Sequence, residues 1–296
     1  MHAPQAGRWE TGARPMPSRT LTAADHSRDS AGLTYVYAVL SRRAGGVSVG
    51  INLNPNHACN WACVYCQVPG LTRGGPPPID LPQLRRELEG LLDEVVSGDF
   101  LRRRAPAGQR QLKDVAFSGD GEPTGAPEFP RAVALAEAAL RARGLLPGVA
   151  LRLITNGSRV DREPVQEGLR RLGQAGGEAW FKVDAVGAEA MARVNGVRLE
   201  PATVERRLRA CAGLCRTWVQ TCLFGLDGQP PPEARLTGLL GLYGRAAGHL
   251  AGVHLYGLAR PSLQPGAERL SRLEPAWLEA FAARVRALGL EVRVSP

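Results

Sequence analysis

Cys59-Asn60-Trp61-Ala62-Cys63-Val64-Tyr65-Cys66 places three thiols within eight residues, in the spacing C-x3-C-x2-C. The preceding run, 47–53, alternates apolar with small or polar residues, as a strand does, and 54–57 breaks that pattern. The thiols are therefore predicted to lie on a loop that follows a strand. Thiolates this close together can ligate a metal ion or an iron–sulfur cluster. Three thiolates leave one position of a four-ligand site for another molecule.

Strands and helices are predicted to alternate along the rest of the chain. Strands are predicted at 35–40, 47–53, 112–117, 149–154, 179–183, 217–224, 253–258 and 290–294. Helices are predicted at 81–97, 127–143, 163–172, 200–214, 231–245 and 274–288. Counted from the strand before the thiols, this gives six β-α units, which predicts an α/β fold with a parallel sheet, a partial (β/α)6 TIM-like barrel. In such barrels the functional residues follow the carboxyl ends of the strands.

The domain organisation is predicted to be simple. Residues 1–32 are poor in apolar side chains and rich in Gly, Pro, Ser, Thr and Arg, which predicts a disordered leader. Residues 33–296 are predicted to form the single barrel domain. The sequence has no apolar run of about 18 residues and no signal-peptide layout, so we expect a cytoplasmic protein without a membrane partner. Six cysteines in 296 residues favour a metal or catalytic role in a reducing compartment over a disulfide framework.

The net charge is +9, which leaves contact with RNA open as a hypothesis. Arginine carries nearly all of the positive charge, because Lys113 and Lys182 are the only lysines. The one dense run, Arg102-Arg103-Arg104, is interpreted as a solvated loop.

Polar and glycine-rich segments follow three predicted strands: 118–124, 155–158 and the pair Lys182 and Asp184. Glycines let a backbone approach a ligand closely, although the same residues also make ordinary turns. Lys182 and Asp184 are two residues apart on a strand and therefore face the same side. Such a charged pair suits a polar barrel lumen, either at a ligand site or as a structural ion pair.

These residues together resemble the radical S-adenosylmethionine (radical SAM) superfamily. The resemblance rests on the C-x3-C-x2-C spacing with aromatic Tyr65 before the last cysteine, and on the strand-end segments that follow it, from about Tyr35 onward. It implies that Cys59, Cys63 and Cys66 hold three irons of a [4Fe–4S] cluster, while the fourth iron binds S-adenosylmethionine (SAM). It further implies reductive cleavage of SAM to a 5′-deoxyadenosyl radical that abstracts hydrogen from a substrate.

The resemblance also implies roles for the other strand ends. The segment after 112–117 would receive the methionine ammonium, Asn156 the cofactor's carboxylate or ribose, and Lys182 the substrate or a carboxylate as the candidate catalytic residue. The implied cofactor-binding residues are Tyr65, Gly119, Asp120, Gly121, Glu122, Pro123, Asn156 and Asp184. An electron donor of the flavodoxin or ferredoxin type is implied as a partner.

Within the superfamily the sequence is most similar to the group that contains the tRNA wyosine-base synthases, through 117–124, 154–158 and 182–185. Those synthases carry a second cluster on cysteines upstream of the main motif, and this chain has no cysteine before Cys59. The likeness therefore implies the cofactor chemistry, and RNA stays a hypothesis for the unidentified substrate.

Other interpretations remain open from the sequence. His57 lies close enough in the chain to complete a zinc site, as in a non-catalytic zinc or nucleic-acid-binding module. A radical SAM activase acting on a protein is a second alternative. Cys211, Cys215 and Cys222 could form an auxiliary cluster or be buried structural residues. Gln220 and Cys222 share one strand face, so Gln220 is a candidate lumen residue, as is Asn195.

Overall fold

The computed structural model describes residues 21–22, 32–41 and 43–296, and the predicted leader 1–32 lies almost wholly outside these ranges. Its centre is an eight-stranded sheet in the order β1-β2-β5-β6-β7-β8-β10-β12. The strands are β1 Val36–Ser41, β2 Gly46–Ile51, β5 Leu112–Phe117, β6 Ala150–Thr155, β7 Glu178–Lys182, β8 Arg216–Cys222, β10 Gly252–Tyr256 and β12 Val292–Ser295. β1 pairs antiparallel with β2, and every other neighbouring pair is parallel.

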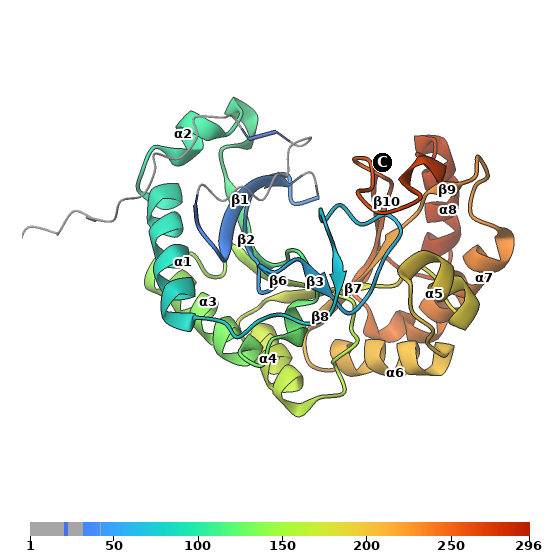
Figure 1. Ribbon diagram of the computed structural model, residues 1–296, viewed down its shortest axis with the longest axis horizontal. Helices are drawn as coiled ribbons and strands as arrows, with labels where there is room; N and C mark the ends of the chain where they lie inside the picture. The colour runs from blue at the N-terminus through green and yellow to red at the C-terminus, as the bar shows by residue number, and fades with distance from the viewer. Residues whose placement is uncertain (1–20, 23–31, 42) are drawn as a thin grey trace, which may run out of the picture.

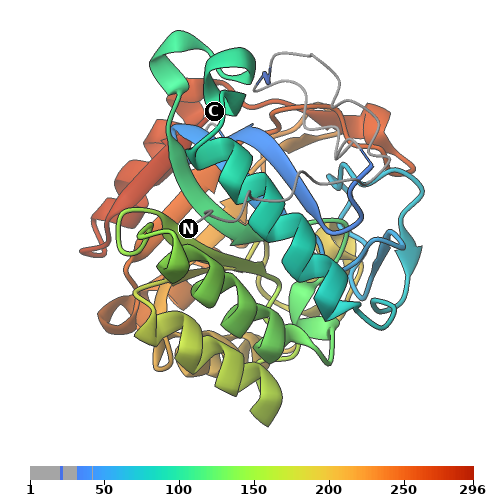
Figure 2. The same ribbon diagram turned by 90° about the vertical axis from the view of Figure 1, so that its left-hand side faces the viewer.

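The helices lie outside the curled sheet, which forms a half-barrel (Figure 1). They are α1 Leu81–Val96, α2 Phe100–Arg104, α3 Phe129–Ala142, α4 Glu163–Gln174, α5 Ala188–Asn195, α6 Pro201–Ala212, α7 Glu233–Ala246 and α8 Pro275–Arg286. Seen from the side, α1, α3 and α4 lie next to one another over the outer face of the sheet (Figure 2). The fold is therefore the α/β partial TIM-like barrel that the alternation of elements predicts.

The sequence of helix α1 explains where the helix begins and which of its faces packs against the sheet. The Asp80 side chain caps the helix by accepting a hydrogen bond of 2.9 Å from the Gln83 backbone N–H. Leu84, Leu88 and Leu92 recur on one face and are fully buried against the sheet. The apolar stripe thus fixes which side of the helix faces the barrel.

The six predicted β-α units and the predicted final strand are confirmed, and the structure differs from the sequence prediction at α2 and α5. Arg102, Arg103 and Arg104 form the last turn of α2, so the prediction of a loop there is wrong. The buried Phe100 at the start of α2 anchors that turn to the core, while Arg102 and Arg103 stay exposed and Arg104 is partly buried over the Phe100 ring. Helix α5 was not predicted, because only its Met191, Val194 and Asn195 are buried. The final strand β12 extends the parallel part of the sheet beyond β10.

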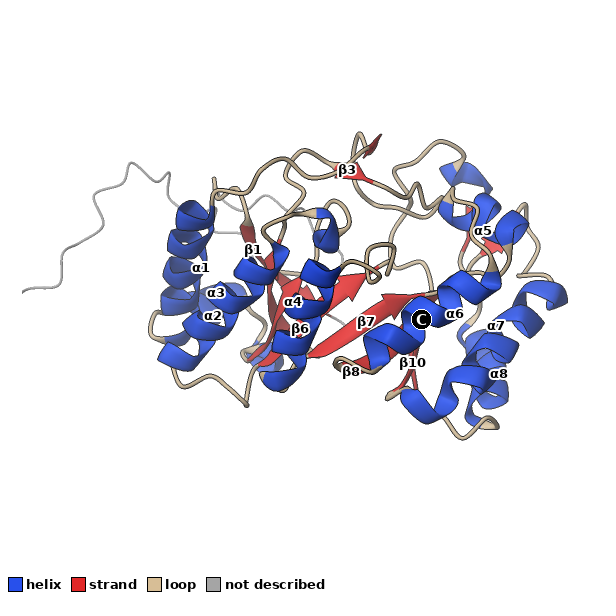
Figure 3. Cartoon of the chain, turned by 90° about the horizontal axis from the view of Figure 1, so that it is seen from below, coloured by secondary structure: helices blue, strands red, loops and turns tan. Residues whose placement is uncertain are grey.

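The loops at the carboxyl ends of the strands build the functional face. Between β2 and α1 the chain forms a long excursion that contains the thiols and the short parallel pair β3 Ala58–Cys59 and β4 Thr72–Arg73. Figure 3 shows this excursion lying along one edge of the sheet, above the strands. A second short pair, β9 Gly225–Leu226 with β11 Leu270–Ser271, follows β8. Within the described residues, no helix is both long and apolar enough to span a bilayer.

Candidate active site

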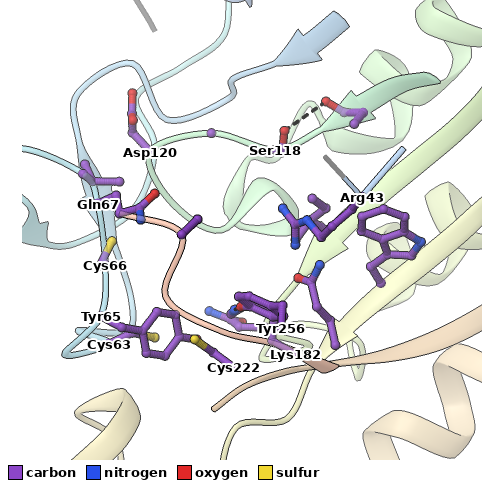
Figure 4. A pocket seen from close by; sticks show the side chains of 18 of the residues that line it. Arg43, Cys63, Tyr65, Cys66, Gln67, Ser118, Asp120, Lys182, Cys222 and Tyr256 are labelled. Carbon is purple, nitrogen blue, oxygen red and sulfur yellow. Dashed lines mark hydrogen bonds between the residues drawn. The ribbon is translucent and has the colours of Figure 1, made fainter. Parts of the chain in front are cut away.

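A cavity of about 310 Å³ opens inside the half-barrel. The three thiols of Cys59, Cys63 and Cys66 line it, together with strand ends from β5 to β10. Of the other predicted site residues, the cavity lining includes Tyr65, Gly119, Asp120, Gly121, Glu122, Asn156 and Lys182. Figure 4 shows Cys63, Tyr65 and Cys66 together on one side of this cavity. The structure thus brings to one place residues that lie more than 100 positions apart in the sequence.

The thiol loop is held by contacts from distant parts of the chain. The Ser262 hydroxyl donates to the backbone oxygens of Val64 at 2.7 Å and Cys66 at 3.1 Å. The Gln264 amide donates to the Val68 carbonyl at 2.8 Å. On the other side, the Ala62 N–H donates to the Asn195 carbonyl at 3.0 Å. These contacts fix the loop without using any thiol.

The thiols themselves are half-buried, and two accept hydrogen bonds. The Asn195 side-chain amide donates to Cys63 Sγ at 3.2 Å, and the Trp61 N–H donates to Cys59 Sγ at 3.4 Å. Burial raises the pKa of Cys59 to about 11 and that of Cys63 to about 12. Burial therefore disfavours the bare thiolates, and a bound cation is what would stabilise them at neutral pH.

A single-ion site is not formed by these residues. Within the described residues, no group of three or more His, Cys, Asp or Glu side chains is arranged to hold one metal ion. His57 Nδ1 lies 2.9 Å from the Pro69 carbonyl, and Nε2 lies 3.8 Å from Asp120, so its ring is engaged away from the cavity. The zinc alternative, which needed His57 beside the thiols, has no support in this geometry. A multi-iron cluster spreads its thiolates over separate irons, and such an arrangement fits three thiols that line one open cavity.

The glycines of the segment after β5 are required by the thiol loop itself. A Cβ on Gly119 would meet Asn52 Oδ1 at 2.2 Å, and a Cβ on Gly121 would meet the Ala58 carbonyl at 2.2 Å. The Asn52 amide also donates to the Asp120 carboxylate at 2.7 Å. Asp120 therefore ties this segment to the start of the thiol excursion.

Glu122 joins two strand ends. One carboxylate oxygen accepts from the Thr124 and Thr155 hydroxyls, each at 2.6 Å, and the other accepts from the Asn156 N–H at 2.6 Å. Burial raises the pKa of this carboxyl group, while these donors oppose the shift. Most of its acceptor capacity is thus used within the protein. Pro123 begins a 3₁₀ turn and is not among the residues that line the cavity.

Asn156 connects β6 to the thiol loop. Its side-chain amide donates to Asn60 Oδ1 at 2.9 Å, and its own Oδ1 accepts from the Ser158 N–H at 3.0 Å. The turn that follows requires Gly157, which has φ of +70° and packs against the Phe181 ring. Asn156 therefore faces the cavity in a fixed orientation beside the thiols.

Asp184 requires a correction, because it is fully buried and lies outside the cavity lining. Its carboxylate accepts from the Tyr65 hydroxyl, from the Asn195 amide at 2.8 Å and from the Cys222 N–H at 2.8 Å. Strand β7 ends at Lys182, so the alternation that would have placed Asp184 in the lumen no longer holds there. Asp184 orients Tyr65 and Asn195 instead of contacting a cofactor.

Lys182 does face the cavity. Its Nζ donates to the Tyr256 hydroxyl at 2.7 Å and lies 3.9 Å from the Asp184 carboxylate and 5.0 Å from the centre of the Tyr65 ring. Burial alone would lower the pKa of Lys182, but Asp184 and Tyr256 outweigh burial and raise it above its ordinary value. Lys182 is therefore a fixed positive charge, not a base.

The remaining cysteines separate into two groups. Cys222 lines the cavity beside Gln220, which confirms Gln220 as a lumen residue. Cys211 and Cys215 lie elsewhere, where the Thr217 hydroxyl donates to Cys211 Sγ at 3.5 Å and Cys215 Sγ lies 3.8 Å from the Cys211 carbonyl. The described coordinates therefore do not gather the three thiols into an auxiliary cluster site.

Sequence reasoning missed several cavity residues, chiefly Arg43, Arg152 and Tyr256. Arg152 and Tyr256 could have been found, because both are polar residues on predicted strands, where residues two apart share one face; Arg152 thus shares its face with Ile154, which also lines the cavity. Arg43 gave no such signal. It lies in the turn between the antiparallel strands β1 and β2, and the structure places it in the cavity lining.

Comparison with known proteins decides the family. The model of the radical SAM superfamily matches residues 53–233, which include the thiols and the strand ends through β8. The chain belongs to the radical SAM superfamily. It is accordingly a radical SAM enzyme, as the spacing of its thiols indicated. No curated protein matches the chain.

Solved structures share the radical SAM fold at low sequence identity. A radical SAM methyltransferase from Sphaerobacter thermophilus is 18% identical with a TM-score of 0.56, over 88% of this chain and 68% of that one. TYW1 with a lysine–pyruvate adduct bound is 14% identical with a TM-score of 0.55, over 86% and 84%. Streptococcus suis SuiB bound to SAM is 10% identical with a TM-score of 0.53, and this chain spans about half of its length, 49%. At these identities the likeness shows the fold.

Proposed function

We propose that this radical SAM enzyme carries one [4Fe–4S] cluster on Cys59, Cys63 and Cys66 and binds SAM beside it. The observation that supports the proposal is that the three thiols open onto the same cavity as Gly119, Gly121 and Asn156. When bound, the reduced cluster supplies the electron that cleaves SAM to a 5′-deoxyadenosyl radical, which abstracts hydrogen from a substrate. The chain's own residues supply position, charge and shielding.

The residues around the thiols suit that task. The N–H groups of Asn195 and Trp61 point at two sulfurs and favour their anionic form. The ring of Tyr65 is buried between the cavity and Phe224, at 5.6 Å between ring centres, and shields the thiols from water. Lys182 supplies a positive charge at the edge of the same space.

We propose that the backbone of 119–122 receives the methionine ammonium, with Glu122 holding that segment against Thr155 and Asn156. Asn156 is the proposed contact for the carboxylate or ribose of SAM. The substrate is proposed to enter from the open side of the half-barrel, and an electron donor of the flavodoxin or ferredoxin type to act from outside. RNA is the first substrate class to test, because the chain has a net charge of +9.

Anaerobic reconstitution tests the cofactor assignment. The wild-type protein should bind iron and sulfide, and dithionite with SAM should then release 5′-deoxyadenosine. Cys63→Ala should lose both properties, because one iron loses its ligand, whereas Cys211→Ala, which removes a thiol outside the cavity, should keep both. Release of 5′-deoxyadenosine by Cys63→Ala at the wild-type rate would refute the assignment.

The substrate is tested by deuterium transfer. A cellular RNA extract enriched in deuterium should label the 5′-deoxyadenosine that the reconstituted enzyme releases. Label that appears only from a deuterated protein extract would favour the activase alternative over RNA.

A further inference from the structure

The cavity extends away from the thiols to a second end, which the roles above do not use. We call it the arginine end and define it by Arg43, Gln220 and Tyr256, all of which line the cavity. Arg43 comes from the β1–β2 hairpin, Gln220 from β8 and Tyr256 from β10. Figure 4 shows Arg43 on the opposite side of the cavity from Cys63 and Cys66, with Tyr256 and Lys182 between them.

Arg43 forms no ion pair with a carboxylate among the described residues, although Asp114 lies near enough to interact with its charge. Its guanidinium carbon lies 5.4 Å from the centre of the Trp180 ring and 5.2 Å from that of Tyr256, and no ion pair involves it among the described residues. The other lumen cations differ in this respect. Arg152 pairs with both Asp114 and Glu178, and Lys182 lies beside Asp184. The aromatic faces thus hold Arg43 in place, and no hydrogen bond to another described residue uses its N–H donors.

Gln220 supplies a second unused donor. Its side chain is 1% exposed, and its Nε2 has no hydrogen-bond partner within the part of the chain that the structure describes. Gln220 pairs in register with Lys182 of β7 and His254 of β10, so the three side chains point to the same lumen face. Buried amide donors are normally satisfied by protein, water or ligand. This one faces the cavity.

Tyr256 supplies a third donor. Its hydroxyl oxygen accepts the hydrogen bond from Lys182 Nζ, so its own proton remains to be donated. Burial raises the pKa of Tyr256, which keeps that proton on the oxygen at neutral pH. Among the described residues, none accepts it. Arg43, Gln220 and Tyr256 therefore present donors to one space, and Asp114, a carboxylate that also lines the cavity, is already engaged by Arg152 and Ser48.

We propose that the arginine end binds an oxyanion of the substrate, a carboxylate or a phosphate, and thereby orients the substrate toward the thiols. A guanidinium binds both groups through paired N–H donors, and the two further donors complete a pocket that selects for negative charge. The identification of the bound molecule as the substrate rests on the proposed function. The binding of an oxyanion at this end of the cavity does not depend on that function.

Calorimetric titration of the reconstituted enzyme with inorganic phosphate and with acetate, each with and without saturating SAM, tests the proposal. Saturable binding of phosphate or acetate is expected in the presence of SAM, and the stronger of the two identifies the chemistry of the substrate group. Arg43→Ala should weaken that binding about 10-fold or more, as expected for the loss of a charge-assisted hydrogen bond. Gln220→Leu, which keeps the volume, should also weaken it about 10-fold.

The matched control is Arg102→Ala, which removes the same charge from an exposed position on α2 and should leave anion binding unchanged. The proposal would be overturned if Arg43→Ala, Gln220→Leu and wild type bound the anion with equal affinity. It would also be overturned if neither phosphate nor acetate bound to the wild-type protein. Displacement of the anion by SAM would assign the site to the cofactor's own carboxylate and also overturn it. Release of 5′-deoxyadenosine, assayed on the same preparation, reports on the proposed function separately, since its absence contradicts that function and not the anion site.

Discussion

The two ends of the cavity are built in opposite ways. The thiol end takes its defining residues from one eight-residue stretch, Cys59 to Cys66, and the rest of the chain only holds that stretch in place. The arginine end takes Arg43, Gln220 and Tyr256 from a hairpin and two strands that are separated by more than 200 positions. The residues proposed to hold the cluster are thus encoded in one local stretch, whereas the arginine end exists only once the sheet has curled into a half-barrel.

The largest expected effect is on iron binding, and it should differ between two cysteines that line the same cavity. Cys66→Ala should abolish the cluster and the cleavage of SAM, because each cluster thiolate holds an iron. Cys222→Ala should keep the full iron content, although Cys222 also lines the cavity. Iron and sulfide analysis of the two variants after anaerobic reconstitution is the measurement. Loss of iron in Cys222→Ala would mean that the thiol end is not defined by the local stretch alone.

The second-largest expected effect is on the free energy of unfolding, and it comes from Asp184, at the boundary between the two ends of the cavity. Asp184→Ala should destabilise the fold by about 3–5 kcal/mol, because it leaves the charge of Lys182 and the donors of Tyr65, Asn195 and Cys222 without their buried acceptor. Urea unfolding of the cluster-free protein measures this change. Asp184→Asn, which keeps one oxygen and the size, is the matched control and should lose less. A loss below about 1 kcal/mol in Asp184→Ala would contradict a buried orienting role.

His254, the neighbour of Gln220 on β10, should make stability depend on pH. His254 lies between Trp180 and Trp218, at 4.6 and 4.7 Å between ring centres, and is 3% exposed. Burial, followed by the positive charge of Arg293, lowers the pKa of His254 to about 3. The unfolded chain, with a pKa of about 6.5, binds the proton first as pH falls, so this contribution is present above pH 6.5 and is lost toward pH 3.

Between pH 7 and pH 5 the loss should be about 2 kcal/mol of the free energy of unfolding. The difference between wild type and His254→Phe, measured by urea unfolding at both pH values, isolates this residue from other titrating groups. A difference that does not change with pH would show that the ring is not held neutral.

The smallest expected effect is on stability and comes from Ser262, whose hydroxyl holds the thiol loop in place. Ser262→Ala removes the hydroxyl that donates to the Val64 and Cys66 carbonyls and should cost about 1 kcal/mol of stability. Limited proteolysis should also cut the loop faster in this variant, because its anchor lies nearly 200 residues away. Ser271→Ala, on the separate β9–β11 pair, serves as the control substitution. Unchanged proteolysis would indicate that Gln264 holds the loop without Ser262.

The sequence predicted the order of the β-α units and the family, because apolar periodicity and cysteine spacing are local properties. It also placed Lys182, Asn156 and the 119–122 segment at the cavity, since each directly follows or ends a strand. It misplaced Asp184, because where the strand ends decides which way the side chain faces. It could not show that Gly119 and Gly121 are needed by Asn52 and Ala58, which pack on them from the thiol excursion.

By itself, then, the sequence determined that three thiols share a loop after a strand and that an α/β half-barrel surrounds them. The tertiary structure alone decided which polar residues are engaged with protein partners and which still offer free donors to the cavity. Glu122 and Asp184 have most of their oxygens occupied, whereas among the described residues no hydrogen bond uses the Arg43 guanidinium or Gln220 Nε2. The physical reason is that hydrogen-bond partners are set by distance in space, and the curling of the sheet brings together residues that no sequence pattern links.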